Sequence, residues 1–317
     1  MPHHVHPDRL LAHWLLFVSL VFVSAFVSVF PLRAGEFDVV YLGGQSNMEG
    51  FGSVKDLSEE QRAEVTGCYI FHSTASLDQQ PAAGLGLWAP LKPGHGTDFK
   101  TDGNVNAYSD RFGVELSLAA ELRRQRPDRK LALIKYARNG SSIDAHAASH
   151  WGCWEPDFHA SNGDHPDVNQ YDHFLATVRN SLTNADVDKD GTVDTLNPIG
   201  IVWMQGESDA MYTAEIAEQY KTNLKRLMDL MRAALRVDDL PVVIGRISDS
   251  GKNETGKRWT HGEVVRAGQA AFVASDESAR LITTTDTYGY SDPWHYDSAG
   301  YLDLGKQFAA GLIEMQK

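Results

Sequence analysis

The chain has 317 residues, with 42 acidic and 29 basic side chains, a net charge of −13 and 42% hydrophobic residues. This composition supports a large buried core and excludes a disordered chain, a collagen and a small protein built on disulfides. Because acidic residues are in excess and no broad basic region occurs, nucleic acid is not expected as a partner.

The N-terminal segment is predicted to direct export. Residues 10–30 are apolar apart from His13 and scattered serines, they follow Arg9, and Pro31 interrupts the pattern. This pattern is typical of a signal peptide or an uncleaved membrane anchor. We therefore assign residues 1–34 to such a segment and expect a secreted, periplasmic or cell-surface protein. Membrane contact is expected only through this segment, and only if it is not cleaved.

The remainder, 35–317, is predicted to be one α/β domain, because short apolar runs alternate with amphipathic stretches and no linker divides it. The predicted strands are Phe37–Leu42, Leu131–Ala137, Ile199–Met204, Val242–Ile247 and Leu281–Thr284. The predicted helices are Gly113–Gln125, Tyr171–Leu182, Ala214–Arg236, Gly262–Ala274 and Ala299–Glu314. This alternation favours a parallel sheet, and the long loops 73–110 and 146–170 are expected to form binding walls.

A candidate nucleophile follows the first predicted strand. The strand continues directly into Gly43-Gly44-Gln45-Ser46-Asn47-Met48, which brings a hydroxyl to the carboxyl edge of the sheet. Open α/β folds bind their ligands at this edge. The alternative is a strand-to-loop turn in which Ser46 only caps a helix.

A candidate base lies near the other end of the chain, in Asp292-Pro293-Trp294-His295. A separation of three residues allows the Asp292 carboxylate to orient the His295 imidazole as a general base for Ser46. The alternative is an aspartate that caps a turn beside a surface histidine. Both motifs follow the same sheet edge, and this shared position favours an acyl-transfer triad of Ser46, Asp292 and His295.

A third polar segment, Trp203-Met204-Gln205-Gly206-Glu207-Ser208-Asp209, ends the third of the predicted strands. The Gln205 amide is a candidate oxyanion donor, together with the backbone N–H groups of Ser46 and Gly113. Glu207 is a candidate accessory residue without a unique partner in the sequence. Asp209 is expected either to support neighbouring groups or to begin the next helix.

Four segments occur in a fixed order: residues 44–48, 112–116 (Phe-Gly-Val-Glu-Leu), 203–209 and 292–295. Together they resemble the sialate O-acetylesterase and acetylxylan esterase group, carbohydrate esterase family six, within the SGNH/GDSL hydrolases. The resemblance covers about residues 37–310. It implies a three-layer α/β/α sandwich with a parallel, flavodoxin-like sheet, no required cofactor, and removal of O-acetyl groups from sugars.

The resemblance also implies roles for individual positions. Ser46, Asp292 and His295 match the triad, while Gly113 and Gln205 match the oxyanion hole. The segment Arg138-Asn139-Gly140-Ser141-Ser142-Ile143 resembles a Gly-Gly-Thr/Ser-Ser loop of the family, with Asn139 in place of the first glycine and a candidate accessory residue. Two further departures are Val114 for a usual proline and Met204 for a frequent histidine, so no role of that histidine is supported here.

An acidic loop is a candidate structural calcium site. Carboxylates alternate along Asp186, Asp188, Asp190 and Asp194, with Gly191 in the sixth position and Thr192 in the seventh. Alternating oxygen ligands around such a glycine are typical of Ca²⁺-binding loops. The twelfth position is Asn197 rather than a bidentate glutamate, which weakens the match, and a solvated loop without metal is the alternative.

The leading hypothesis is therefore an exported serine esterase that acts on acetylated carbohydrates. Two rivals stay open: another deacylase of the same fold that acts on lipid or peptidoglycan esters, and a catalytically silent carbohydrate-binding domain. In an oxidising compartment Cys68 and Cys153 are a candidate disulfide, and two separate thiols are the equally simple alternative.

Overall fold

The computed structural model describes residues 34–78, 80–159, 168–251 and 256–316. One compact unit comprises Ala34–Lys317. The predicted export segment, residues 1–34, falls outside the described residues except for Ala34, and Met1–Arg33 form the other unit. Within the described ranges, none of the helices combines the length and the apolar character that a membrane span requires. The following description concerns the larger unit.

A seven-stranded sheet forms the centre of this unit, in the order β11-β10-β9-β1-β8-β3-β4. All neighbouring strands are parallel except β4, which is antiparallel to β3. The strands are β1 (Glu36–Gly44), β3 (Cys68–His72), β4 (Trp88–Pro90), β8 (Lys130–Ala137), β9 (Thr195–Met204), β10 (Val242–Gly245) and β11 (Ala279–Ile282). The predicted parallel sheet is confirmed, and β3 and β4 are additions to the five predicted strands.

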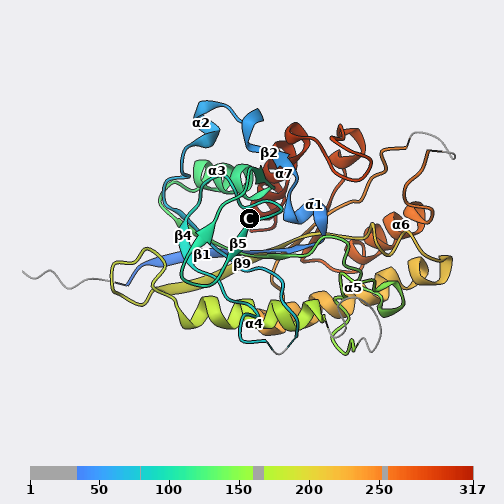
Figure 1. Cartoon of the computed structure of the whole chain (residues 1–317), viewed down its shortest axis with the longest axis horizontal. Coiled ribbons are helices and arrows are strands. Elements are labelled where there is room, and N and C mark those ends of the chain that lie inside the picture. Colours follow the sequence, from blue (N-terminus) through green and yellow to red (C-terminus); the bar gives the residue numbers. More distant parts are fainter. Residues whose placement is uncertain (1–33, 79, 160–167, 252–255, 317) are drawn as a thin grey trace, which may run out of the picture. The chain divides into compact units, whose positions relative to one another are not determined.

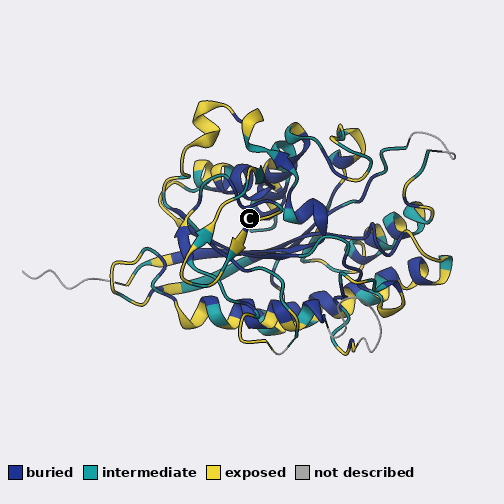
Figure 2. Ribbon diagram, in the orientation of Figure 1, coloured by how far each residue is buried: buried dark blue, intermediate teal, exposed yellow. Residues whose placement is uncertain are grey.

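Helices cover both faces of the sheet and complete the predicted three layers (Figure 1). Helices α3 (Glu115–Gln125) and α7 (Ser298–Met315) pack together on one face. Helices α4 (Gln170–Thr183), α5 (Ala214–Leu235) and α6 (Gly262–Val273) cover the other. The sheet between the layers is largely buried (Figure 2).

Local sequence accounts for the longest helix, α5. The Thr213 side chain accepts a hydrogen bond from the Ile216 N–H and caps its first turn. Its apolar residues recur every three or four positions and are buried, which fixes one face against the sheet. Arg236, with φ 61°, adopts the left-handed conformation that ends the helix.

Short elements fill the loops above the sheet: helices α1 (Ser46–Glu49) and α2 (Glu59–Arg62), strands β2 (Gly52–Ser53), β5 (Lys100–Thr101), β6 (Asn106–Ala107) and β7 (Arg111–Phe112), and 3₁₀ turns at Val54–Asp56, Ala145–Ala147 and Thr284–Thr287. Counting only the parallel strands in chain order, the sheet has the order 2-3-1-4-5-6, whereas flavodoxin has 2-1-3-4-5. In both arrangements the direction of the strand order changes beside β1, so the residues after β1 lie at the point of the carboxyl edge where open sheets bind ligands.

Candidate active site

The turn after β1 places Ser46 at the first position of α1, where it is buried with 4% of its surface exposed. Gly44 makes this turn possible, because it has φ 144° and a Cβ there would come within 2.0 Å of the Met204 oxygen. The Gln45 N–H then donates to the same oxygen at 2.9 Å. The predicted hydroxyl is therefore held against the end of β9.

Asp292 and His295 form the predicted pair, with 2.7 Å between Asp292 Oδ2 and His295 Nδ1. The backbone N–H groups of Trp294 and His295 donate to Asp292 Oδ1 at 2.8 and 2.9 Å and fix the carboxylate. Burial alone would raise the pKa of Asp292, but the hydrogen bonds from His295 and from these amides lower it. Burial lowers the pKa of His295 despite the opposing effect of Asp292, which favours a neutral imidazole able to accept a proton.

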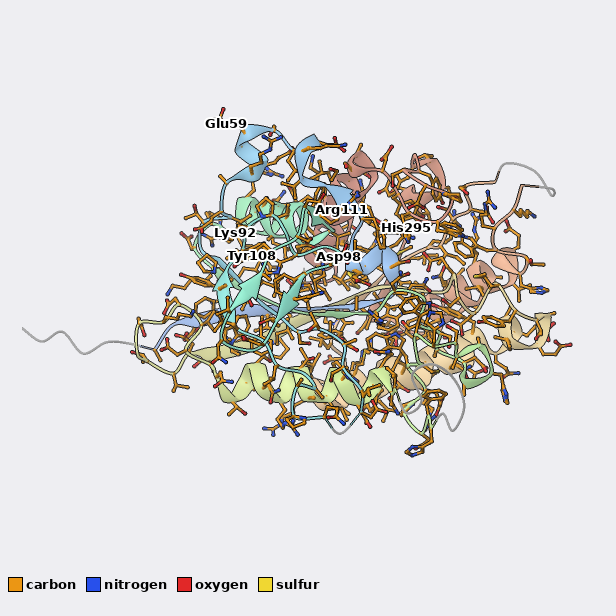
Figure 3. All side chains as sticks on the ribbon, viewed as in Figure 1. Glu59, Lys92, Asp98, Tyr108, Arg111 and His295 are labelled. Carbon is orange, nitrogen blue, oxygen red and sulfur yellow. The ribbon has the colours of Figure 1, made fainter. Side chains whose placement is uncertain are left out.

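Phe51, which follows α1, covers one face of the His295 imidazole. The two rings are stacked with centroids 3.5 Å apart and an interplanar angle of 3°. His295 is labelled in Figure 3. Asp292 and Phe51 together hold the ring by a hydrogen bond and by stacking.

Asn47 joins the Ser46 turn to the loop that carries His295. Its Nδ2 donates to the Trp294 oxygen at 3.2 Å, and its Oδ1 accepts the Tyr296 N–H at 3.3 Å. Its Nδ2 also donates to Glu207 Oε1 at 2.8 Å, and its Oδ1 accepts the Tyr301 hydroxyl at 2.8 Å. Because Trp294 and Tyr296 flank His295, the residue after Ser46 is bonded to both neighbours of the predicted base.

Gln205 lies at the end of β9 but is committed to other partners. It is fully buried, and its Nε2 donates to the Ser141 oxygen at 3.1 Å and to Asp209 Oδ2 at 2.6 Å. An amide nitrogen has two hydrogens, so both are used. The Tyr220 hydroxyl donates to Gln205 Oε1 at 3.1 Å. In this structure the Gln205 side chain therefore has no donor free for an oxyanion, and its oxyanion role stays a prediction.

Gly113 is committed in a similar way. Its N–H donates to Glu115 Oε1 at 2.8 Å, and Glu115 Oε2 forms a fully buried ion pair at 2.8 Å with Lys135 Nζ. Lys135 Nζ also donates to the Glu49 oxygen at 2.9 Å and to the His95 oxygen at 2.7 Å. The predicted Gly113 donor is thus occupied, whereas the Ser46 N–H has no acceptor within the described part of the chain.

Glu207 and Asp209 are both fully buried carboxyls beside these groups. Burial raises the pKa of Glu207 to about 7, and its Oε2 has no hydrogen-bond partner among the described residues. Burial also raises the pKa of Asp209 to about 6, although Gln205 and backbone amides donate to it. Asp209 Oδ1 accepts the N–H groups of Ile143 and Asp144 at 3.1 and 2.8 Å, so Asp209 fixes a loop rather than starting a helix.

Asn139, the second accessory candidate, follows β8, which pairs with β1 on the side away from β9. The preceding residue, Arg138, donates its N–H to the Gly44 oxygen at 3.0 Å, and the Asn139 N–H donates to Glu49 Oε2 at 2.7 Å. A cavity of about 490 Å³ opens here and is lined by Glu49, Arg138, Asn139 and residues of the predicted binding wall 73–110. Asp98, labelled in Figure 3, is one of those residues.

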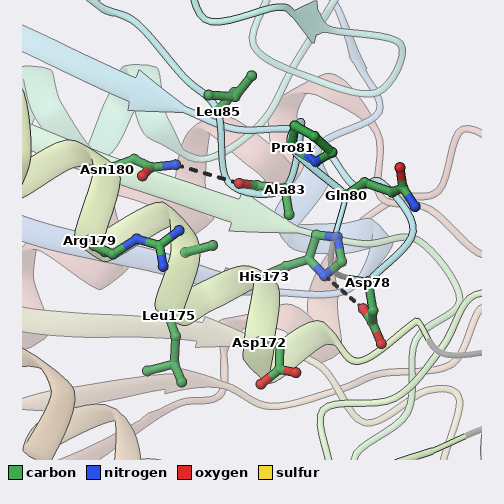
Figure 4. A pocket seen from close by; sticks show the side chains of 11 residues that line it. Asp78, Gln80, Pro81, Ala83, Leu85, Asp172, His173, Leu175, Arg179 and Asn180 are labelled. Atoms are coloured by element: carbon green, nitrogen blue, oxygen red, sulfur yellow. Dashed lines mark hydrogen bonds and ion pairs between the residues drawn. The ribbon is translucent and has the colours of Figure 1, made fainter.

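A second, larger hollow of about 600 Å³ lies between α4 and residues 78–85 (Figure 4). In it His173 Nδ1 is 3.5 Å from Asp78 Oδ1, and Asn180 donates to the Ala83 oxygen at 3.5 Å. None of the predicted triad, oxyanion or accessory residues lines this hollow. It therefore has no part in the predicted chemistry.

The acidic loop brings three of its predicted calcium ligands together. One carboxylate oxygen from each of Asp186, Asp188 and Asp194 lies within 4.8 Å of the others. Asp186 Oδ1 and Asp188 Oδ1 are buried atoms without hydrogen-bond partners in the described chain, which fits a cation. Asp190 is not in this group, and its Oδ1 accepts the Thr192 N–H. The residues present thus fit a smaller ligand set than the predicted five, and calcium binding stays a prediction.

Cys68 and Cys153 are both buried free thiols. The disulfide alternative is therefore not realised in this structure. Burial raises the pKa of both thiols, which makes them unreactive in place.

Two contributors to the site were not predicted. The residue Asn47 stood inside a recognised motif, but its hydrogen bonds reach Glu207, 160 positions away, and Trp294, Tyr296 and Tyr301, 247 to 254 positions away, which no local pattern reveals. Phe51 gave no signal either, since an aromatic residue beside glycines is ordinary in a core.

The comparisons with known proteins agree with this geometry. A model of the family "Carbohydrate esterase, sialic acid-specific acetylesterase" matches residues 36–314. No curated protein sequence matches the chain. Among solved structures, a protein of Arabidopsis thaliana is similar with a TM-score of 0.57 at 18% identity, over 88% of this chain and 98% of that one.

Two further solved structures share the fold. NanS has a TM-score of 0.58 at 16% identity, over 90% of this chain and 99% of NanS. XAC1771, a carbohydrate acetylesterase from Xanthomonas citri, has a TM-score of 0.57 at 19% identity over 88% of this chain, which spans only 56% of XAC1771. The family match covers most of the chain, and these neighbours share its fold. The chain therefore belongs to the carbohydrate esterase family of sialic acid-specific acetylesterases and is a carboxylic ester hydrolase.

Proposed function

We propose that this protein removes O-acetyl groups from carbohydrates through an acetyl-enzyme on Ser46. In the first half-reaction His295 Nε2 takes the proton of the Ser46 hydroxyl while Oγ attacks the acetyl carbonyl. The tetrahedral intermediate expels the sugar oxygen, which receives the proton from His295, and Ser46 keeps the acetyl group. In the second half-reaction His295 deprotonates a water that attacks the ester, and acetate and free Ser46 result.

The observation that carries this proposal is the hydrogen bonding of Asn47. Asn47 follows Ser46 directly, and it bonds to the backbone of both residues that flank His295. Asp292 and Phe51 fix the orientation of the imidazole ring, and Asp292 occupies Nδ1 at 2.7 Å. Nε2 is therefore the nitrogen left for the serine. These contacts support a serine and a base held within one rigid unit.

For the oxyanion we propose the Ser46 N–H and the Asn139 side-chain amide. The N–H groups of Gly113 and the amide of Gln205 are bonded elsewhere, as described above. The Asn139 side chain has no hydrogen-bond partner among the described residues, and its backbone is bonded to Glu49 at the end of α1. Loss of one such donor typically lowers kcat by about 10²–10³-fold.

Two features support an acetylated carbohydrate over the lipid and peptidoglycan alternatives. Trp294, between Asp292 and His295, is 47% exposed and offers an aromatic face beside the triad. The cavity next to α1 is lined mainly by polar residues rather than by an apolar groove for an acyl chain. The family name and the XAC1771 neighbour point to the same substrate class.

We further propose export through the N-terminal segment, for the reasons given by its sequence, and a structural calcium ion on Asp186, Asp188 and Asp194. The calcium proposal is supported by the two unpartnered buried oxygens, and the ion would hold the loop without contacting the substrate. We propose no other cofactor and no nucleic-acid partner.

The deciding experiment is Ser46→Ala, measured by release of p-nitrophenol from p-nitrophenyl acetate. The expected result is a loss of kcat/KM of at least about 10³-fold with an unchanged thermal unfolding temperature. Ser275→Ala, at an exposed serine after α6, is the matched control and keeps full activity. Retained activity in Ser46→Ala would contradict the proposal.

Two further measurements separate the rivals. A preference for the octanoyl over the acetyl ester would favour a lipid deacylase. If the wild type does not react with a fluorophosphonate serine probe but binds glycans, the protein is a silent binding domain.

A further inference from the structure

The loop of residues 138–144 follows β8 and carries Asn139, the proposed oxyanion donor. Its middle residues, Ser141, Ser142 and Ile143, are buried although they lie in none of the helices and strands described above. A buried backbone group without a hydrogen-bond partner costs free energy, so a segment of this kind must be held by groups outside it. The groups that hold this loop therefore also decide where Asn139 lies.

The end of the loop is held by Asp209, a fully buried carboxylate that follows β9. Its Oδ1 accepts the N–H groups of Asp144 at 2.8 Å and of Ile143 at 3.1 Å, and its Oδ2 accepts the Gln205 amide at 2.6 Å. An ionised carboxylate is an acceptor only, so the three donors converge on it without competition from a hydrogen of its own. Asp209 thus fixes two consecutive N–H groups that lie 66 and 65 positions away in the sequence.

Gln205 holds the middle of the same loop. The second hydrogen of its Nε2 is donated to the Ser141 oxygen at 3.1 Å, so a single amide group joins Ser141 to Asp209. Gln205 is itself fixed, because Gln269 donates to its backbone oxygen at 3.1 Å and the Tyr220 hydroxyl lies 3.1 Å from its Oε1. Gln205 and Asp209 therefore act as one unit, which we call the loop clamp.

Ser141 connects the loop clamp to Asn139. The Ser141 N–H and hydroxyl both donate to the Arg138 oxygen, at 3.3 and 2.7 Å, and close a turn that contains Asn139. At its other end the Arg138 N–H donates to the Gly44 oxygen at 3.0 Å, which ties this turn to the one that carries Ser46. Asn139 is thus held between the Ser46 turn and the loop clamp, so a displacement of Ser141 also displaces the Asn139 amide.

The loop clamp lowers the stability of the fold, which indicates a role beyond stability. Burial raises the pKa of Asp209 to about 6 although three donors bind it, so its ionised form is less stable in the protein than in water. Repulsion from the Asp144 carboxylate acts in the same direction. An apolar side chain would fill the same space without this cost, but it could not hold two N–H groups in fixed positions.

We infer that Gln205 and Asp209 are positioning residues of the reaction. They hold residues 138–144 so that the Asn139 amide faces the oxyanion that forms at Ser46. This inference rests on the proposed function and adds two residues that act through Asn139 without touching the substrate. A direct oxyanion donor at Gln205 would act independently of Asn139, whereas a positioning residue has no effect once the Asn139 amide is absent.

A double-mutant cycle tests this difference. Asn139→Ala should lower kcat for p-nitrophenyl acetate by about 10²–10³-fold, and Asp209→Asn by about 10- to 100-fold, because its NH₂ group repels one of the three donors. In the double variant kcat should stay within about twofold of Asn139→Ala alone, whereas independent effects would multiply. The rates are measured at pH 8, where Asp209 is ionised in the wild type, and at a temperature where circular dichroism shows each variant folded. Asp276→Asn, which alters a carboxylate bonded to Arg232 before β11, is the control and keeps the wild-type kcat.

Hydrogen–deuterium exchange tests the loop clamp without turnover. In Asp209→Asn the amides of Ile143 and Asp144 should exchange at least about 10-fold faster than in the wild type, while the amides of β1 stay protected. Gln205→Met is the second variant in case Asp209→Asn does not fold. It leaves Asp209 with both of its backbone donors, and it should lower kcat by about 10-fold in the wild type but not in Asn139→Ala.

Three outcomes would overturn the inference: losses of kcat that multiply in the double variants, a wild-type kcat in both Asp209→Asn and Gln205→Met, or unchanged exchange at Ile143 and Asp144 in Asp209→Asn. The proposed function is tested separately by Ser46→Ala. If that variant keeps its activity, the reaction at Ser46 is refuted, and the exchange rates still decide whether the clamp holds the loop.

Discussion

The two sides of the Ser46 turn differ in how their polar groups are used. On the β9 side, which comprises Asn47, Gln205, Asp209 and Asp292–His295, nearly every donor and acceptor has a protein partner. On the β8 side, which comprises Arg138, Asn139 and the cavity beside them, the Arg138 guanidinium lies over the Trp151 ring, and neither the Arg138 nor the Asn139 side chain makes a hydrogen bond to another described residue. The polar groups of the β9 side are hydrogen-bonded within the protein, whereas the side chains of Arg138 and Asn139 on the β8 side are free to bond water or a ligand.

This difference has a physical reason. A buried polar group costs free energy unless it is hydrogen-bonded, so the β9 side is stable only in one arrangement and holds the reacting groups in fixed positions. On the β8 side water replaces the missing partners, and a substrate can displace that water. We therefore expect substitutions on the β9 side to lower kcat. On the β8 side we expect them to alter substrate preference, except at Asn139, whose proposed oxyanion role also makes it a determinant of kcat.

Among substitutions on the β9 side, Asp292→Asn is expected to have the largest effect on kcat. The amide cannot hold the imidazole in the required tautomer, and the positive charge that forms on His295 during catalysis loses its partner. We expect kcat to fall by about 10²–10⁴-fold with little change in KM, measured by steady-state hydrolysis of p-nitrophenyl acetate. Asp229→Asn, at an exposed position of α5, is the control. A rise in KM at constant kcat would place Asp292 in substrate binding and break the comparison.

Asn47→Ala is expected to have the next largest effect. The substitution removes the acceptor of the Tyr301 hydroxyl and of the Tyr296 N–H and the side-chain donor to Glu207, which costs about 2–4 kcal/mol of unfolding free energy. It also releases the His295 loop from the Ser46 turn, so kcat should fall by about 10- to 100-fold even at a temperature where the variant is fully folded. Urea unfolding and the rate of fluorophosphonate labelling measure the two effects. A destabilised variant with normal labelling would show that Asn47 has only a structural role, and Asn184→Ala at the exposed end of α4 is the control.

The sequence was sufficient for the parts of the fold that local patterns encode. All five predicted strands and all five predicted helices occur, because each has an apolar run or stripe of adequate length. Strand β3 was not predicted, since Cys68–His72 is only five residues long, and the paired edge strand β4 lies within an expected loop. The order of the strands was also beyond local patterns, because it depends on which buried edges pair.

The same limit applies to the site. The Asp292–His295 contact could be predicted because three residues separate the partners. The sequence could not show whether the predicted oxyanion donors are free, because other residues accept their hydrogen bonds. Glu115 accepts the Gly113 N–H and is itself held by Lys135. Ser141 and Asp209 accept the hydrogen bonds of the Gln205 amide. A residue type and a position in a motif do not reveal which donors are already used.

The stacking of Phe51 on His295 predicts a smaller effect, on pH dependence. Catalysis requires a neutral His295, and burial lowers its pKa below the usual 6.5, so activity should persist into mildly acidic solution. Phe51→Leu admits water to the ring and raises the pKa toward 6.5, which moves the acidic limb of kcat/KM to higher pH by less than about one unit. Phe51→Tyr keeps the stacked ring and is the control. Because burial raises the pKa of Glu207 to about 7, the pH profile of a single variant contains a contribution from Glu207, and the difference between the two variants isolates the effect of Phe51. Identical acidic limbs in both variants would show that Phe51 does not shield the base.

The acidic loop lies outside both sides of the Ser46 turn. The effect expected there is the smallest, a change in thermal stability on calcium binding. Asp194 Oδ1 accepts the Gly35 N–H at 2.8 Å, so the loop holds the start of β1, whereas Ser46 follows its end, about 30 Å away along nine residues of strand. Calcium should therefore raise the unfolding temperature by a few degrees without altering kcat or the pH profile. Asp188→Asn should abolish the rise because Asp188 belongs to the close group of carboxylates, while Asp190→Asn should retain most of it because Asp190 does not. Superimposable unfolding curves in calcium and in EDTA would contradict the calcium site, and a change in kcat on adding calcium would contradict the separation of this loop from the chemistry.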